Sequence, residues 1–423
     1  MSETNTAKLV RTVGFWGLVA MCINAVIGSG VFLLPHESYK LLGPFSLWAP
    51  LLFAVPVFIL ALNFAEAARH FDQPGGAYLY AKTAFGDFLG FETGWMNWLA
   101  RVTSLASLSN GFVVALALLA PGLKTGFPRA AVIVGIILFL AAIHYVGVRY
   151  GAASIYVFTF GKLVPLIGFI ILALVVWKSN PIPGSFAVPA AANWSEAALF
   201  MLFAYAGFEN LGVPAGEYKN PRRDLPLALL IGILIIAAIY ALVQLGAMAT
   251  VPDLSKSDTP IASAAAELIG PAGAIIVTIG ALLSMAGTNS GTTLEGSRML
   301  YALSLGRRSA MLSFVHPRFH TPTVAITIHA TVALVLALAG SFRALALLSA
   351  VARLATYLAT CLAVPFLRGR TEGFRIRRLI VPFLGTLVAL VFVITLDSKR
   401  LIAAAIALTV GGIVYAVTRP RAS

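Results

Sequence analysis

The sequence has few charged residues and almost no cysteine. Only 11% of its 423 residues are Asp, Glu, Lys or Arg, and 59% are hydrophobic, whereas ordinary soluble domains are about 25% charged. Cys22 and Cys361 both lie in apolar segments, which argues against a disulfide framework. The start, Met1 to Arg11, lacks the layout of a cleavable signal peptide. The composition therefore predicts an all-α polytopic membrane protein that keeps its first helix.

Long apolar segments occur along the whole chain. Windows of about 19–25 residues fit membrane-spanning helices. One segment, 84–120, is too long for a perpendicular span, so we expect it to tilt or to extend beyond the membrane. The remaining connections are too short for an extramembrane domain. We predict twelve helices, near 12–35, 45–69, 84–120, 128–147, 152–177, 194–218, 225–250, 271–304, 321–339, 342–367, 375–396 and 400–418.

The basic residues are distributed unevenly between the two sides that these helices define. With a cytoplasmic N-terminus, 19 of the 30 Lys and Arg residues fall inside, 8 fall outside, and Arg101, Lys162 and Arg353 lie within helices. Cytoplasmic loops of membrane proteins are enriched in Lys and Arg. We therefore expect cytoplasmic tails at 1–11 and 419–423 in a plasma or inner membrane. The net charge of +14 is explained by topology, so we predict no nucleic-acid partner.

Two hydrophobic segments are interrupted by glycine, at Asn24 to Pro35 and at Phe203 to Pro214. Glycine frees the backbone and leaves N–H and C=O groups unpaired. Such groups are tolerated at membrane depth only where they are buried in protein or line a cavity. Paired breaks in two halves of a chain indicate a transporter's midplane binding site.

The two breaks lie five helices apart, in helices 1 and 6. An odd offset places those helices in opposite orientations, as an inverted repeat of five plus five helices requires. The first repeat then covers 12–177 and the second 194–367, with two extra helices in 375–418. We find no residue identity between the halves, so the repeat depends on spacing alone.

Several motifs resemble those of the amino acid–polyamine–organocation superfamily, in its bacterial amino-acid permease type. Each motif is modest by itself, but they occur in the right order on the right helices, over residues of about 12 to 370. The resemblance implies the leucine-transporter-type fold, with broken helices 1 and 6, and amino-acid or polyamine substrates. The motifs are Ile27 to Pro35, Phe64 to Arg69, Pro74 to Tyr80 with Phe85 and Gly86, Phe203 to Pro226, Gly296 to Ala302, and His316 to Pro322.

The first break is suited to an amino-acid carboxylate. The amides of Gly28, Ser29 and Gly30 begin a half-helix, whose positive end attracts an anion, and Ser29 adds a hydroxyl. The resemblance places the ammonium group on the carbonyls of Val26, Phe203 and Ala206, beside Gly207. A zwitterion is then held mostly by backbone. The alternative is that the glycines serve only close helix packing.

Two residues near the second break are candidates for further roles. Phe203 resembles the aromatic gate that closes over substrate, with plain core or lipid packing as the alternative. Glu209 is an intramembrane carboxylate, and such groups are usually functional. It is a candidate proton or cation site that could attract a cationic substrate, carry a proton, or tie its helix to a neighbour.

Lys162 lies about ten residues into helix 5, where a lysine is costly unless it is partnered or neutral. By resemblance, it occupies the place where sodium-driven relatives bind an ion between helices 1 and 8. Its ammonium could hold the backbone near Ile23 and a hydroxyl such as Ser284. We predict sodium-independent, proton-coupled transport. The alternative is a fixed structural cation, which suits an exchanger.

These features favour a secondary amino-acid transporter that works by alternating access over a channel or a membrane enzyme. No repeated filter segment, phosphate loop, nucleophile elbow or metal-ligand spacing is visible, so we predict no cofactor, no metal and no enzymatic activity. The expected partners are an amino acid, protons and the lipid bilayer. We favour uptake of neutral, small or medium apolar amino acids. The alternative is an amino-acid exchanger, including one for cationic amino acids or polyamines. The sequence does not give the oligomeric state.

Overall fold

The computed structural model describes residues 14–71, 75–147, 151–177, 187–190, 192–212, 219–308, 311–371 and 379–419. These residues form helices and connecting turns, with no strand among them. The helices are α1 (Phe15–Val26), α2 (Gly30–Leu42), η1 (Gly43–Leu47), α3 (Ala49–Ala68), α4 (Gly76–Phe85), α5 (Asp87–Leu119), η2 (Pro121–Leu123), α6 (Gly126–Val146), α7 (Gly151–Trp177), α8 (Trp194–Tyr205), η3 (Phe208–Gly212), α9 (Pro221–Thr250), η5 (Leu254–Lys256), α10 (Pro260–Ile269), α11 (Pro271–Ser304), α12 (Thr323–Ala339), α13 (Phe342–Thr371), α14 (Ile380–Ile394) and α15 (Ser398–Thr418).

Many of these helices are long and apolar enough to cross a bilayer. Among the described residues, seven single helices meet that test, and α1 with α2 makes an eighth if the bent pair is one span. Large apolar side chains such as Ile394, Val417 and Phe139 are exposed on their outer faces, as lipid contact requires. The prediction of a polytopic helical membrane protein is confirmed. The count of twelve and the inverted repeat remain predictions.

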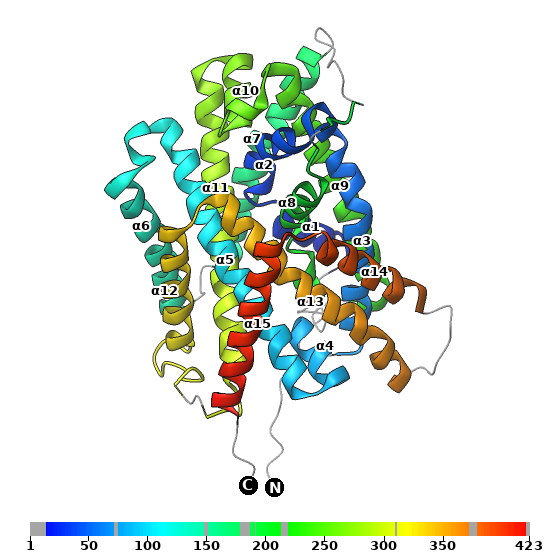
Figure 1. Ribbon diagram of the computed structural model, residues 1–423. Helices are drawn as coiled ribbons and strands as arrows, with labels where there is room; N and C mark the ends of the chain where they lie inside the picture. The colour runs from blue at the N-terminus through cyan, green and yellow to red at the C-terminus, as the bar shows by residue number, and fades with distance from the viewer. Residues whose placement is uncertain are drawn as a thin grey trace.

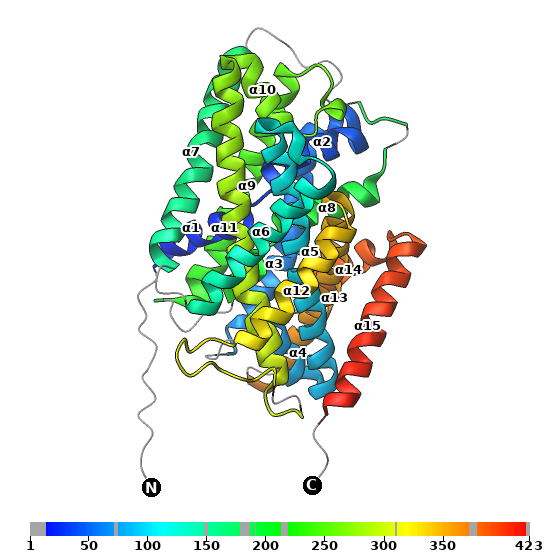
Figure 2. The same cartoon turned by 90° about the vertical axis from the view of Figure 1, so that its left-hand side faces the viewer.

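The helices run between two edges of the molecule (Figures 1 and 2). In both views, α10 lies at the upper edge, and α4 and the end of α15 lie at the lower edge. The long helix α5 packs against both α11 and α13, and α2 packs against α8. The labels of α1 and α8 lie near mid-height in Figure 1. The main buried apolar cluster includes faces of α1, α2, α3, α8 and α9. One face of each interrupted helix is thus buried against its neighbours.

Two predicted boundaries are wrong. Helix 1 does not end at 35, because α2 continues to Leu42 with Pro35 inside it; a single proline removes one backbone hydrogen bond, which membrane helices tolerate. The segment 84–120 does not begin at 84, because Gly86, with φ of 93°, ends α4 and starts α5 at Asp87. That conformation favours glycine, which has no Cβ.

Part of the predicted layout lies outside the described residues. This applies to the tail 1–11, to most of the tail 419–423, to Pro74 at the start of one motif, and to 213–218, which includes Pro214, within the motif Phe203 to Pro226.

Candidate functional site

The first predicted break is a sharp bend between α1 and α2. The two axes meet at 55°. Ile27 ends α1 in an extended conformation, with its N–H on the carbonyl of Ile23 at 3.0 Å. Gly28 and Ser29 are outside both helices and buried, and Gly30 begins α2. The amides of this turn therefore lie at the N-terminal end of α2, where the helix dipole favours an anion.

The second predicted break follows α8. The N–H of Ala206 bonds to the carbonyl of Phe203 at 3.2 Å, so that carbonyl already has a partner. Gly207 has a φ of 126°, and its N–H donates to Oε2 of Glu209 at 2.8 Å. A short 3-10 helix, η3, then begins at Phe208. The positive φ explains the glycine at this turn, since side chains rarely adopt it.

The two breaks lie against each other. A Cβ added to Gly207 would be 2.4 Å from the carbonyl oxygen of Ala25, and one added to Gly30 would be 3.1 Å from Cα of Ala204. The hydroxyl of Tyr240 links the same two segments, since it donates to the carbonyls of Ala204 at 2.9 Å and Val26 at 3.5 Å. The chain thus brings Val26, Gly30 and Gly207 to one place.

Polar oxygens lie at the first break and on the neighbouring part of α11. A Cβ on Gly28 would be 3.2 Å from Oγ1 of Thr288 in α11. Within the described part of the chain, the buried Ser29 Oγ, Thr288 Oγ1 and Asn289 Oδ1 have no hydrogen-bond partner. The amide of Asn289 donates to Oγ of Ser109 in α5 at 3.3 Å. Because buried polar atoms are normally hydrogen-bonded, these oxygens are suited to a polar ligand.

Lys162 and Ser284 hold the carbonyls that the first break releases. Lys162 is 2% exposed, and its Nζ donates to the carbonyls of Asn24 at 2.8 Å and Ile27 at 2.7 Å. The hydroxyl of Ser284 donates to the carbonyl of Gly28 at 3.0 Å. The sequence predicts that the ammonium of Lys162 holds the backbone near Ile23, and in the structure it bonds to the carbonyl of the next residue, Asn24. Ser284 bonds to the carbonyl of Gly28, which follows Ile27.

Phe203 lies beside the breaks, in the last turn of α8. Its ring makes an edge contact with Phe342, at the start of α13, with centroids 6.2 Å apart. Phe203 is buried. This contact joins the end of α8 to the start of α13. The same helix α8 also packs against α2.

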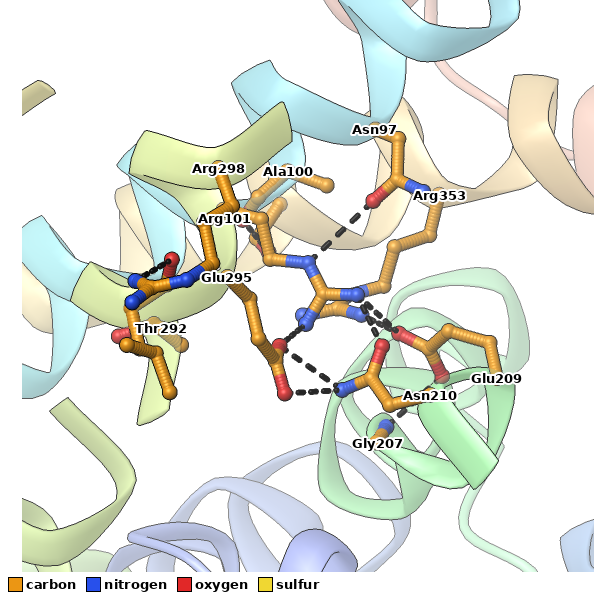
Figure 3. A network of polar contacts seen from close by, with 12 residues as sticks. Asn97, Ala100, Arg101, Gly207, Glu209, Asn210, Thr292, Glu295, Arg298 and Arg353 are labelled. Carbon is orange, nitrogen blue, oxygen red and sulfur yellow. Dashed lines mark hydrogen bonds and ion pairs between the residues drawn. The ribbon is translucent and has the colours of Figure 1, made fainter. Parts of the chain in front are cut away.

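Glu209 belongs to a buried network of charges (Figure 3). Its Oε1 bonds to Nη1 of Arg353 and lies 3.9 Å from Nη2 of Arg101, and its Oε2 accepts from the hydroxyl of Tyr357 at 3.2 Å. All three charged side chains are nearly inaccessible. Among the three roles that the sequence suggests for Glu209, these contacts favour the structural one, in which its side chain links η3 to α13.

The network continues to α11. Arg101 bonds to Glu295 and to Asn210, and the amide of Asn210 donates to both oxygens of Glu295 at 3.1 and 2.9 Å. Glu295 is the most accessible charged member, with 38% of its side chain exposed. Four elements, α5, η3, α11 and α13, are therefore joined at one point. Sequence analysis missed Glu295, although it is an acid in an otherwise apolar segment.

A second charged cluster joins other helices. Arg343, at the start of α13, bonds to Glu37 of α2 at 2.6 Å and to Glu196 of α8 at 2.8 Å. Arg400 of α15 lies 3.4 Å from Glu196. The half-helices α2 and α8 are thus tied to the same helix that Phe203 contacts.

Among the described residues, no group of three or more His, Cys, Asp or Glu side chains is arranged to hold a metal ion.

Comparison with known proteins is consistent with this architecture. The serine/threonine exchanger SteT of Bacillus subtilis (strain 168) is 28% identical over 381 residues, which cover 88% of this chain and 86% of the relative. An uncharacterized transporter of Mycobacterium tuberculosis (strain ATCC 25618 / H37Rv) is 28% identical over 420 residues, or 97% of this chain and 92% of the relative. Another from that strain is 30% identical over 368 residues, or 79% and 75%.

A family model gives the assignment. The model for amino acid permeases matches residues 13–414, nearly the whole chain. The match covers both broken helices and every residue of the buried network. The chain is thus a multi-pass membrane transporter for amino acids, and it belongs to the amino acid permease family.

Proposed function

We propose that the protein carries neutral amino acids without sodium, by alternating access around the two breaks. The amino acid's carboxylate binds the amides of Gly28, Ser29 and Gly30, and its ammonium binds the carbonyls of Val26 and Ala206, beside Gly207. The contact between the breaks supports this site, because it brings both half-helix ends together. Phe203 acts as the gate, held by Phe342.

Sodium independence follows from the position of Lys162. Carbonyls of unwound membrane helices are the usual ligands of a coupling ion in transporters with broken helices. Here the ammonium of Lys162 is bonded to two of those carbonyls, Asn24 and Ile27, and Ser284 takes the third, Gly28. While Lys162 is protonated, its positive charge would repel a sodium ion. This is the single observation that carries the mechanism.

The preference for neutral substrates follows from Glu209. A free carboxylate beside the site would attract a cationic side chain. Here Arg353 and Tyr357 bond to it, and Arg101 lies against it. With Glu295 also bonded to Arg101, the network contains two cations and two anions. Its charges compensate one another, so the site offers no excess negative charge to an arginine or a polyamine.

The protein's coupling mode has two candidates. In the first, Lys162 exchanges a proton during the cycle and transport is proton-coupled uptake. In the second, Lys162 is a permanent brace and the protein exchanges amino acids. The second is favoured by the similarity to SteT, which is named a serine/threonine exchanger. Serine and threonine are therefore the first substrates to test, alongside alanine and leucine.

Uptake into liposomes that contain the purified protein tests the proposal. We expect saturable, stereoselective uptake of a neutral amino acid that is unchanged when sodium is replaced by choline. A preference for arginine would overturn the assignment of substrate class. An inward proton gradient should drive accumulation into liposomes that contain no amino acid. Uptake that requires an internal amino acid and ignores the gradient would instead identify an exchanger.

We also propose that both termini lie in the cytoplasm. The proposal is supported by the excess of basic residues on that side.

A further inference from the structure

Glu92, in the second turn of α5, is a buried acid outside the central site. It is 7% exposed. Within the described residues, neither of its carboxylate oxygens has a hydrogen-bond partner, and no cation is ion-paired with it. The mechanism proposed above does not use this side chain. A buried acid without a partner, in a helix that is apolar enough to cross a membrane, is a candidate functional group.

The carboxyl group of Glu92 points at α15. A Cβ added to Gly411 would be 2.7 Å from Oε2 of Glu92, and one added to Gly412 would be 3.7 Å from Oε1. The indole N–H of Trp95, one turn further along α5, donates to the carbonyl of Ala407 at 2.9 Å. The carboxyl group therefore occupies the space that the two glycines leave in the contact between α5 and α15.

The charged groups around this part of α5 pair with groups other than Glu92, although Nη1 of Arg307 has no hydrogen-bond partner among the described residues. Asp87 binds Lys82 of α4 at 3.2 Å and Arg307, after α11, at 2.7 Å. The guanidinium of Arg307 is also held over the ring of Tyr415 of α15, 4.7 Å from its centroid. Two arginines of α13 bond to other acids, Arg353 to Glu209 and Arg368 to Glu66.

An ionised carboxylate without a partner is strongly disfavoured in such surroundings, whereas its protonated form is neutral. We propose that Glu92 is a proton-binding site, and that the bound proton allows α15 to pack on α5. When the proton leaves, the charge must reach water or a cation, and the contact with α15 loosens. This role of Glu92 does not depend on how substrate transport is coupled. It is tested by measurements of protonation and stability, without a transport assay.

Infrared spectroscopy of the purified full-length protein tests the site directly. At neutral pH, the spectrum should contain the carbonyl band of a protonated carboxylic acid, and Glu92→Gln should remove the intensity of one such group. Raising the pH should remove the same intensity from the unmodified protein. The exposed residue Glu267 supplies the control, since Glu267→Gln should leave the band unchanged. Equal bands in the unmodified protein and in Glu92→Gln would overturn the proposal.

Thermal unfolding at several pH values supplies a second test. The unfolded chain releases this proton near a pH of about 4.3, the ordinary value for glutamate, so folding takes up a proton at higher pH. Stability should therefore fall as the pH rises, and Glu92→Gln, which needs no proton, should lack this component. Parallel pH profiles of stability in the unmodified protein and in Glu92→Gln would contradict the proposal. Failure of Glu92→Gln to fold would also contradict it, because the amide matches the neutral acid in shape.

The glycines opposite Glu92 give a third test. Gly411→Ala should push the carboxyl group away and lower the melting temperature, since the new methyl group would lie 2.6 Å from Cδ1 of Trp95 and 2.7 Å from Oε2 of Glu92. Gly135→Ala on α6, where nothing lies within 4 Å of the added atom, is the control. The loss in Gly411→Ala should be smaller when Glu92 is replaced by alanine. Part of the loss should remain in that background, because Trp95 is still present. An equal loss in both backgrounds would mean that the whole effect comes from Trp95, and it would contradict the role given to the acid in this contact.

Discussion

Gly207 lies against the carbonyl oxygen of Ala25, and a side chain on Gly207 would begin 2.4 Å from that oxygen. The contact joins the two helix breaks, and Gly207 has a positive φ of 126°. Both facts exclude a side chain. We therefore expect Gly207→Ala to combine backbone strain of about 1–3 kcal/mol with displacement of α1, and to reduce amino-acid binding at least tenfold, measured by calorimetry.

Gly168 is the control for this substitution. It lies within α7, and an added Cβ would meet nothing within 4 Å. Gly168→Ala should bind substrate as the unmodified protein does. If Gly207→Ala binds equally well and is equally stable, the contact between the breaks does not shape the site.

A second prediction concerns the amides of the first break. Gly30→Val should abolish substrate binding while the protein still inserts, because the added side chain would press on Cα of Ala204, 3.1 Å from its Cβ, and fill the space assigned to the carboxylate. Overpacking of this kind costs about 1–3 kcal/mol. Gly28→Val should behave alike, since it meets Thr288. Gly135→Val is the control, and unchanged affinity in Gly30→Val would remove these glycines from the site.

The sequence indicates these positions because glycines within apolar segments have few explanations. The bend at Gly28 to Gly30 and the turn at Gly207 both lie where the sequence places breaks. The same reasoning finds Lys162, because a lysine at membrane depth requires a partner, and the partners are carbonyls of the first break.

The sequence does not show which side chains meet across helices. Glu209, Glu295 and Arg101 are distant along the chain, and their contact depends on how α5, η3 and α11 pack. The sequence also does not give the exact ends of the helices. Pro35 reads as a stop but lies within α2, and Gly86 starts α5 later than the apolar segment suggests. These features depend on tertiary packing and on a single backbone angle.

A third prediction tests the role of Lys162. Lys162→Ala should remove proton-driven accumulation and the two hydrogen bonds from Nζ to the carbonyls of Asn24 and Ile27, with a loss of stability of about 1–3 kcal/mol. Uptake by proteoliposomes under an imposed pH gradient measures the first effect, and thermal unfolding measures the second. The exposed Lys256 gives the control Lys256→Ala. Proton-driven accumulation that survives in Lys162→Ala would show that this lysine is not the coupling residue.

A fourth prediction concerns the buried pair Glu209 and Arg353. Arg353→Gln should destabilise the protein by about 3–5 kcal/mol, because it leaves a buried carboxylate without its main partner. Combining it with Glu209→Gln should recover part of that loss, since both charges are then absent. Unfolding in detergent, followed by temperature or denaturant, gives the four values of the cycle.

The exposed pair Lys124 and Asp258 provides a matched cycle. Their atoms are 2.7 Å apart, but both side chains are more than half exposed. Exposed pairs contribute about 0–1 kcal/mol, so Lys124→Gln should be nearly neutral. A loss of the same small size in Arg353→Gln would mean that the buried network does not hold η3 to α13.

The fifth prediction concerns topology and uses the single helix α9 (Pro221–Thr250). Asn220 precedes it and Lys256 follows it, and both are exposed. Because one apolar helix separates them, the two positions must lie on opposite sides of the membrane. From the excess of basic residues, we propose that Asn220 lies on the cytoplasmic side. A membrane-impermeant thiol reagent added to intact cells should therefore label Lys256→Cys and leave Asn220→Cys unlabelled until the membrane is opened. The native Cys22 and Cys361 are fully buried and should contribute no background. The reverse pattern would place both termini outside, and labelling of both positions from outside would contradict α9 as a membrane span.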